Sequence, residues 1–296
     1  MRFAAALCLA ACFIAAGCGG SSSAQEEPNA PTLEELWRAP GEDVAIVPGT
    51  ADFGPGDVRF TFLVIDGQGR VVTRPTAKVW LARGLKSTPF ARTTAPSESI
   101  GVGKTEPGEP TEVFVAHLQL KKPGTYWLLA EPVGGRKIQA VGNVVVKSQT
   151  AAPDVGAPAI ASNTPTLDDA TLDQLSTSTT PDPELYKISI ADALAAKKPF
   201  VVVFATPKYC TSRTCGPVVD VVSAVRRKHA DDRIPFIHVE IYQDNDPAKG
   251  ENQWVKEWKL PSEPWVFLVG ADGTIKSRFE GTLSVDELDE AVTKLR

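Results

Sequence analysis

The chain has 296 residues, more than one ordinary domain of about 100–200 residues, and we therefore expect two domains. Hydrophobic residues are 43% of the sequence and charged residues 23%, which excludes disorder of the whole chain. The net charge of −5 is not that of a nucleic-acid-binding protein, which needs a basic face, and we expect no nucleic-acid partner.

Residues 1–17 have the pattern of a secretory signal peptide. Arg2 supplies a basic start, and residues 3–16 are apolar or small but too few to span a membrane, which takes about 20. Residues 15–18 read Ala-Ala-Gly-Cys and resemble a bacterial lipobox, whose cysteine becomes the lipidated first residue of the mature chain. We predict lipidation at Cys18 and a protein held by its lipid on the outer side of the bacterial cell membrane.

Two alternatives stay open at this terminus. Residues 9–12 read Leu-Ala-Ala-Cys, formally a better lipobox, although cleavage before Cys12 would leave a very short apolar stretch. The second alternative is a plain signal peptide with incidental cysteines. If Cys18 is acylated, the folded part keeps two thiols, Cys210 and Cys215, and an oxidising compartment favours reading these two as a pair.

Residues 18–42 form a polar tether with one short helical turn at 32–37, and a hydrophobic period of two begins after it. Apolar or alternating runs predict strands at 57–65, 70–73, 77–82, 112–120, 125–131 and 137–147. A Pro/Gly/Ser-rich excursion occupies 88–110. Such a series of short strands within 43–147, with no long helical pattern, predicts an immunoglobulin-like antiparallel β-sandwich.

Two residues of this predicted sandwich carry specific expectations. Residues 123–130 read Pro-Gly-Thr-Tyr-Trp-Leu-Leu-Ala and resemble the strand-F region of immunoglobulin-like domains, where a tyrosine hydroxyl folds back onto the preceding corner. Tyr126 holds that position. His117 is the one histidine of the segment, and a lone strand histidine is ordinarily packed or solvated rather than a ligand. Nothing here predicts catalysis.

Residues 148–183 are rich in Ala, Pro, Ser and Thr, which predicts an extended linker. Within 184–296 helical and strand patterns alternate, and the strand at 200–204 is wholly apolar, as in a sheet covered on both faces. The other elements predicted there are helices at 189–197, 217–229, 248–259 and 284–295, and strands at 235–242, 265–269 and 274–279. This alternation predicts an α/β domain.

Residues 215–217, Cys-Gly-Pro, open a predicted helix after a loop that follows a strand, and this arrangement resembles the thioredoxin superfamily. Residues 262–269 resemble that family's segment with a cis-proline, and the Asp-Gly turn at 272–273 lies at the spacing of its secreted, membrane-tethered members. The resemblance covers 184–296. It implies an α/β thioredoxin-like fold with Pro264 beside the cysteines, and thiol–disulfide exchange on the thiols or disulfides of exported proteins.

Three positions depart from the family's pattern. Its usual active site is Cys-X-X-Cys, but Val218 stands at the position of the second cysteine, so the pair here is Cys210-X4-Cys215. Tyr209 replaces the tryptophan that usually precedes the motif. Val203 stands where reductases often hold a buried acid that moves protons.

We expect Cys215 to attack as the thiolate, because a helix N-terminus favours the charged sulfur, and Cys210 to resolve the mixed disulfide. Pro264 would then shape the substrate groove. The alternative function is a non-catalytic binding or scaffolding lipoprotein in which a permanent Cys210–Cys215 disulfide staples the loop. Closing so short a loop stabilises a fold by about 2 kcal/mol.

Two other chemistries have partial support. Thiol peroxidases of the superfamily need a Thr or Ser between a proline and the cysteine, and Pro207, Thr211 and Cys215 approximate this pattern with a spacing off by one. Copper-delivery members add a distant histidine to two cysteines. His229 and His238 are the candidates here, and we expect both to pack or to face solvent. The prediction is therefore no metal site and no cofactor.

Overall fold

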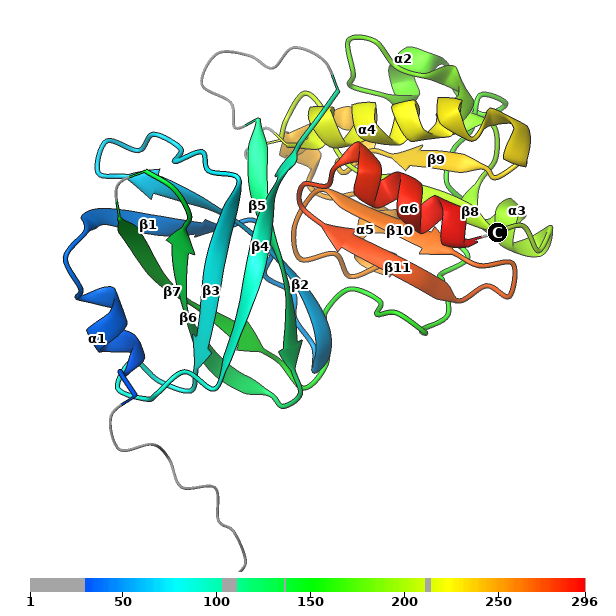
Figure 1. Cartoon of the computed structure of the whole chain (residues 1–296). Coiled ribbons are helices and arrows are strands. Elements are labelled where there is room, and N and C mark those ends of the chain that lie inside the picture. Colours follow the sequence, from blue (N-terminus) through cyan, green and yellow to red (C-terminus); the bar gives the residue numbers. More distant parts are fainter. Residues whose placement is uncertain (1–29, 103–110, 136, 211–213, 296) are drawn as a thin grey trace, which may run out of the picture. The chain divides into compact units, whose positions relative to one another are not determined.

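The structure is a computed structural model that describes residues 30–102, 111–135, 137–210 and 214–295. The predicted signal peptide and Cys18 lie outside these residues. Two β-sheets follow one another along the compact unit Pro31–Arg296 (Figure 1). In the described part of the chain, no helix is both long enough and apolar enough to cross a membrane.

The first sheet is a closed barrel with the strand order β1-β2-β5-β4-β3-β6-β7. Its strands are β1 (Glu42–Pro48), β2 (Gly56–Asp66), β3 (Thr76–Ala82), β4 (Ala91–Ser99), β5 (Glu112–Leu120), β6 (Gly124–Pro132) and β7 (Ile138–Val146). The barrel closes at β1, which pairs antiparallel with β2 and parallel with β7. Alternate residues of β2, Phe60, Phe62 and Val64, are fully buried in the core, as the period of two predicts.

The predicted immunoglobulin-like sandwich is wrong, because β1 joins β2 to β7 and leaves no two separate layers. The sequence pattern also missed β4, which lies inside the predicted excursion at 88–110. β4 reads Ala-Arg-Thr-Thr-Ala-Pro-Ser-Glu-Ser, and only Ala95 of it is buried. Its pairing with β3 and β5, rather than an apolar pattern, makes it a strand. A polar strand of this kind cannot be recognised by hydrophobic alternation.

The corner before β6 has the predicted tyrosine contact. The Tyr126 hydroxyl donates to the carbonyl of Lys122 at 2.7 Å, and the N–H of Lys122 donates to the same hydroxyl at 3.2 Å. A buried phenol needs such a partner for its polar end. The expectation for Tyr126 is confirmed, although the sheet around it is a barrel.

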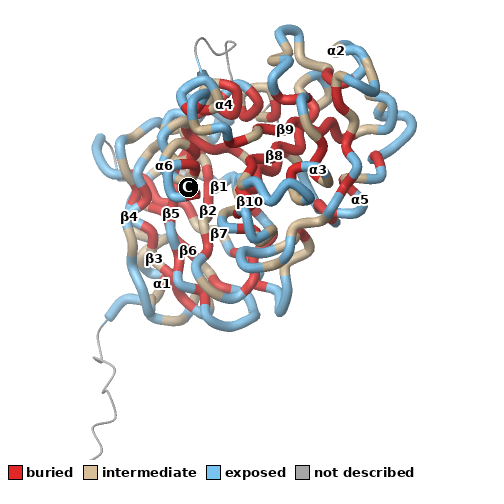
Figure 2. The backbone as a smooth tube through the Cα atoms, turned by 90° about the vertical axis from the view of Figure 1, so that its right-hand side faces the viewer, coloured by how far each residue is buried: buried red, intermediate tan, exposed pale blue. Residues whose placement is uncertain are grey.

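The second sheet has four strands in the order β11-β10-β8-β9. They are β8 (Phe200–Phe204), β9 (Phe236–Val239), β10 (Trp265–Val269) and β11 (Ile275–Glu280). β8 runs parallel to β9 and antiparallel to β10, and β10 is antiparallel to β11. Every residue of β8, β9 and β10 is buried (Figure 2), as expected for strands covered on both faces.

The helices of the described residues are few and mostly short. They are α1 (Leu33–Trp37), α2 (Leu172–Leu175), α3 (Ile190–Ala195), α4 (Cys215–Lys228), α5 (Gln253–Glu257) and α6 (Val285–Leu295). The predicted helix at 248–259 is instead a 3₁₀ turn, Pro247–Lys249, followed by the short α5. Gly250 separates the two with a φ of +74°, which a helix does not adopt. The predicted helix at 189–197 ends at Ala195, because Lys197 turns to a φ of +51°.

The predicted fold class is therefore wrong in both halves of the chain. The described residues are mostly β, in a barrel and a second sheet, and they show no clear α/β thioredoxin fold. The physical reason lies in the helices, since two of the four predicted in 184–296 shorten to about a turn and a half. The long helix α4 and the helix α6 pack against each other and share an apolar cluster with Val201 and Val203 of β8.

Residues 148–183 are predicted as an extended linker, but Ala152, Ser162 and Leu175 of this segment are buried.

Charged groups connect the barrel to the second sheet. The guanidinium of Arg59 in β2 pairs with Glu287 of α6 at 2.7 Å. The carboxylate of Glu280 in β11 accepts the N–H groups of residues 51 and 52, each at 2.8 Å. Both contacts are largely shielded from water, which strengthens them.

Candidate functional site

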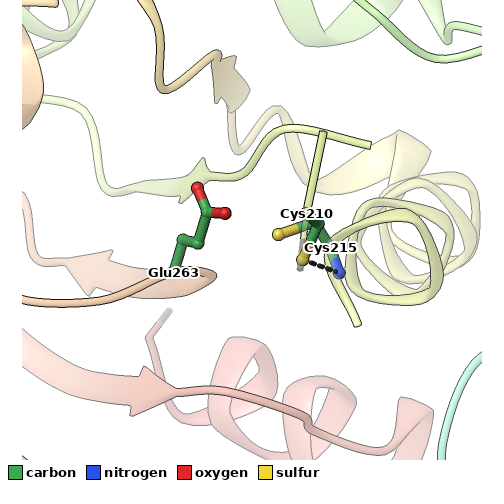
Figure 3. Close-up of side chains that lie close together, drawn as sticks. All are labelled: Cys210, Cys215 and Glu263. Carbon is green, nitrogen blue, oxygen red and sulfur yellow. Dashed lines mark hydrogen bonds between the residues drawn. The ribbon is translucent and has the colours of Figure 1, made fainter. Parts of the chain in front are cut away.

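The candidate site lies where β8, α4 and β10 meet. Cys210 is in the loop after β8, Cys215 is the first residue of α4, and Glu263 directly precedes Pro264 in the loop before β10. The two sulfur atoms and a carboxylate oxygen of Glu263 all lie within 4.8 Å of one another. Figure 3 shows the Glu263 side chain reaching toward the two cysteines from the opposite side of the site. Three segments far apart in sequence thus converge on one small cluster.

Cys215 is the inner member of the pair. Its side chain is fully buried, and its backbone N–H donates to the sulfur of Cys210 at 3.3 Å (Figure 3). The first amides of a helix have no partner within the helix, so the Cys210 sulfur satisfies one of them. A hydrogen bond from the Cys215 thiol to Cys210 raises the pKa of Cys215 far above its usual range, and burial raises it further.

Cys210 is the outer member of the pair, because it is partly exposed whereas Cys215 is buried. Its sulfur receives the N–H and the thiol hydrogen of Cys215. Hydrogen bonds donated to a sulfur stabilise its negatively charged form. Of the two cysteines, Cys210 is therefore the one that a client can reach.

Glu263 is the candidate site residue that the sequence reasoning missed. Burial raises the pKa of its carboxyl to about 7, and the negative charges of Cys210, Glu240 and Glu251 act in the same direction. Its Oε2 atom is buried and has no hydrogen-bond partner among the residues that the structure describes. One signal could have found it: it directly precedes Pro264, which was predicted beside the cysteines.

The resemblance predicts Pro264 beside the cysteines. In the structure Pro264 directly follows Glu263, the residue whose carboxylate lies near the two sulfurs. The peptide bond between Glu263 and Pro264 is cis. Pro264 is itself buried, and its carbonyl accepts the N–H of Gly281 at 2.9 Å. Proline has no N–H to donate, and one hydrogen bond already reaches its carbonyl.

Neither predicted histidine candidate faces the sulfurs. His238 is buried, its Nδ1 bonds the Tyr186 hydroxyl at 2.5 Å, and its Nε2 donates to the carbonyl of Ala205 at 3.0 Å. Burial lowers the pKa of His238, which favours the neutral form of the ring. His229 bonds Asp232 and Asp289 through its two ring nitrogens. Both rings are packed, as expected, and the copper alternative receives no histidine ligand from them.

Aromatic side chains border the cysteine pair. The rings of Tyr209 and Tyr242 meet edge to face with centroids 6.3 Å apart, and the ammonium of Lys208 lies over Tyr209. A cavity of about 580 Å³ lies beside Tyr242 and is lined also by Glu240 and Trp254.

The structure thus brings together Cys210, Cys215 and Glu263, and Pro264 directly follows Glu263 in the chain. Of the residues in the peroxidase alternative, Thr211 lies outside the described residues. Two thiols and one carboxylate are donors that a metal ion could use.

Neither a protein-family model nor a curated protein sequence matches this chain.

Proposed function

We propose that this chain carries out thiol–disulfide exchange on exported proteins through Cys210 and Cys215. The observation that carries the proposal is the asymmetry of the pair. Cys210 is a partly exposed residue, and its sulfur accepts hydrogen bonds from the buried cysteine Cys215. An exchange reaction needs one sulfur that a client can reach and a second that can attack from within.

The roles of the two cysteines are the reverse of those expected from the helix N-terminus alone. A client disulfide cannot reach a fully buried sulfur, whatever the helix dipole does to its charge. Cys210 is therefore the attacking residue in this proposal, and Cys215 is the resolving residue.

The reaction then has two balanced steps. The Cys210 sulfur attacks one sulfur of a client disulfide, which breaks the client's S–S bond and forms a mixed disulfide, and the first client thiolate leaves. The Cys215 sulfur next attacks the Cys210 sulfur, breaks the mixed disulfide, and forms the Cys210–Cys215 bond. Two electrons pass from the pair to the client, and the two thiol protons end on the two client thiols. The same steps in reverse oxidise a client dithiol.

The reduction potential of the pair tests this proposal. Structural disulfides of secreted proteins have potentials below about −300 mV, whereas pairs that exchange lie above that value. A potential above it favours exchange over the permanent staple of a scaffolding lipoprotein.

We also propose that the chain acts outside the cytoplasm, held at the cell membrane by a lipid on Cys18. Cys18→Ser is expected to move the protein from the membrane fraction to the soluble fraction, because a lipid anchor is its only proposed attachment. The measurement is fractionation of cells expressing either chain, with Cys12→Ser as the matched control that stays with the membrane. Release by Cys12→Ser but not by Cys18→Ser would contradict the assignment.

A further inference from the structure

We propose that reduced Cys210 and Cys215, together with Glu263, form a binding site for one Zn²⁺ ion. The inference goes beyond thiol–disulfide exchange and does not depend on it, because metal binding needs the two thiols but no client.

The spacing of the three donor atoms suits a single ion. All lie within 4.8 Å of one another. Zinc binds sulfur at about 2.3 Å and carboxylate oxygen at about 2.0–2.2 Å, so a tetrahedral ion holds such ligands about 3.6–3.8 Å apart. Closing the cluster therefore takes movements of about 1 Å at most. Cys215 is the first residue of α4, and Glu263 lies in the loop two residues before β10, so one of the three ligands rests on a regular element.

The types of donor select the ion. Two thiolates and one carboxylate are a mixed soft and hard set that suits zinc, whereas magnesium and calcium prefer oxygen alone. A copper(I) ion would be satisfied by the two sulfurs and would gain little from the carboxylate. Three protein ligands also leave one position open, as in zinc sites that keep a water or an exogenous ligand.

An independent observation points to a cation, namely the unpartnered oxygen of Glu263. Oε2 is buried and has no hydrogen-bond partner among the described residues. Glu240 and Glu251 add further negative charge around the same carboxylate. Burying an oxygen that accepts no hydrogen bond costs folding free energy. A cation bound between this oxygen and the two sulfurs would offset that cost.

Metal binding at this site depends on the redox state of the pair. Formation of the Cys210–Cys215 disulfide consumes both thiolate ligands, so the oxidised chain loses two of its three donors. The site therefore binds Zn²⁺ only when the pair is reduced, and bound Zn²⁺ slows oxidation of the pair.

The test uses the full chain with Cys8→Ser, Cys12→Ser and Cys18→Ser, so that its only thiols are Cys210 and Cys215. The reduced protein is titrated with Zn²⁺ by calorimetry without oxygen, and the oxidised protein is titrated in parallel. We expect one ion per reduced chain and none per oxidised chain. A Cd²⁺ titration is expected to show sulfur-to-cadmium charge-transfer absorption in the reduced chain only. The proposal is overturned if the reduced and oxidised chains bind Zn²⁺ equally, or if the reduced chain binds none. This titration needs no substitution at Cys210, Cys215 or Glu263.

Variants then test the third ligand. Glu263→Gln is expected to weaken Zn²⁺ binding at least about tenfold, because an amide is a poor substitute for a carboxylate. Glu251→Gln is the matched control, since it removes a neighbouring charge without removing a ligand, and less than about a threefold loss is expected. Equal losses in the two variants would exclude Glu263 as a ligand. Exchange with a disulfide probe, assayed with EDTA, reports separately on the proposed function, so failure of one proposal is distinguishable from failure of the other.

Discussion

Cys210→Ser is expected to abolish disulfide exchange, whereas Cys215→Ser is expected to leave the first step intact and trap its product. Cys210 is the sulfur that a client can reach, so its loss removes the nucleophile and slows adduct formation at least about 100-fold. Without Cys215 no internal thiol releases the client, and the mixed disulfide on Cys210 persists. Mass spectrometry after reaction with oxidised glutathione measures both outcomes.

The two variants control each other, because each keeps one cysteine of the pair. They are compared in the background Cys8→Ser, Cys12→Ser and Cys18→Ser, where no other thiol can form the adduct. A persistent adduct on Cys215 in the Cys210→Ser chain, with none on Cys210 in the reciprocal variant, would contradict the assigned roles. That result would restore the roles expected from the helix N-terminus.

Asp52→Ala is expected to lower the free energy of unfolding by about 3 kcal/mol. Asp52 is 2% exposed, and its carboxylate accepts the N–H groups of Ala151 and Ala152 at 2.8 and 3.1 Å. It also pairs with the guanidinium of Arg278 at 3.4 Å. Alanine leaves these buried donors short of an acceptor and removes one of the two carboxylates that pair with Arg278. Urea denaturation of the reduced chain measures the loss.

Asp57→Ala is the matched control for this variant. Asp57 lies in β2 of the same barrel but is exposed, so its removal is expected to change the stability by less than about 0.5 kcal/mol. Equal stabilities of the Asp52 and Asp57 variants would show that the buried carboxylate does not hold the barrel to the segment that follows it.

Strands with a strong apolar pattern could be predicted from the sequence. The wholly apolar run 200–204 is β8, and the predictions at 112–120 and 265–269 match β5 and β10. The closure of the barrel could not be predicted, because it depends on which strands pair. The polar β4 and the double pairing of β1 are properties of the folded sheet and leave no periodic pattern.

The predicted helix at 248–259 failed for a related reason. Its apolar residues Trp254 and Trp258 have helical spacing, but Gly250 and the capping residue Asn252 begin a new turn in the middle of it. Local turn chemistry overrode the periodic pattern.

The site was predicted in part. Cysteine counting and the predicted compartment identified Cys210 and Cys215 as a pair, and their sulfurs lie close together. Their order of action depends on burial, which a sequence does not show. Glu263 comes from a segment about 50 residues further on, and only the folded chain brings its carboxylate to the sulfurs.

The reduction potential of the Cys210–Cys215 pair tests the central claim most directly. It is measured on the full chain with Cys8, Cys12 and Cys18 replaced by serine, equilibrated with EDTA in defined ratios of reduced and oxidised dithiothreitol or glutathione. The exchange mechanism predicts a value above about −300 mV, in the range where client disulfides and the pair can convert one another. A value below about −300 mV would make the pair a structural disulfide and would contradict the proposed function.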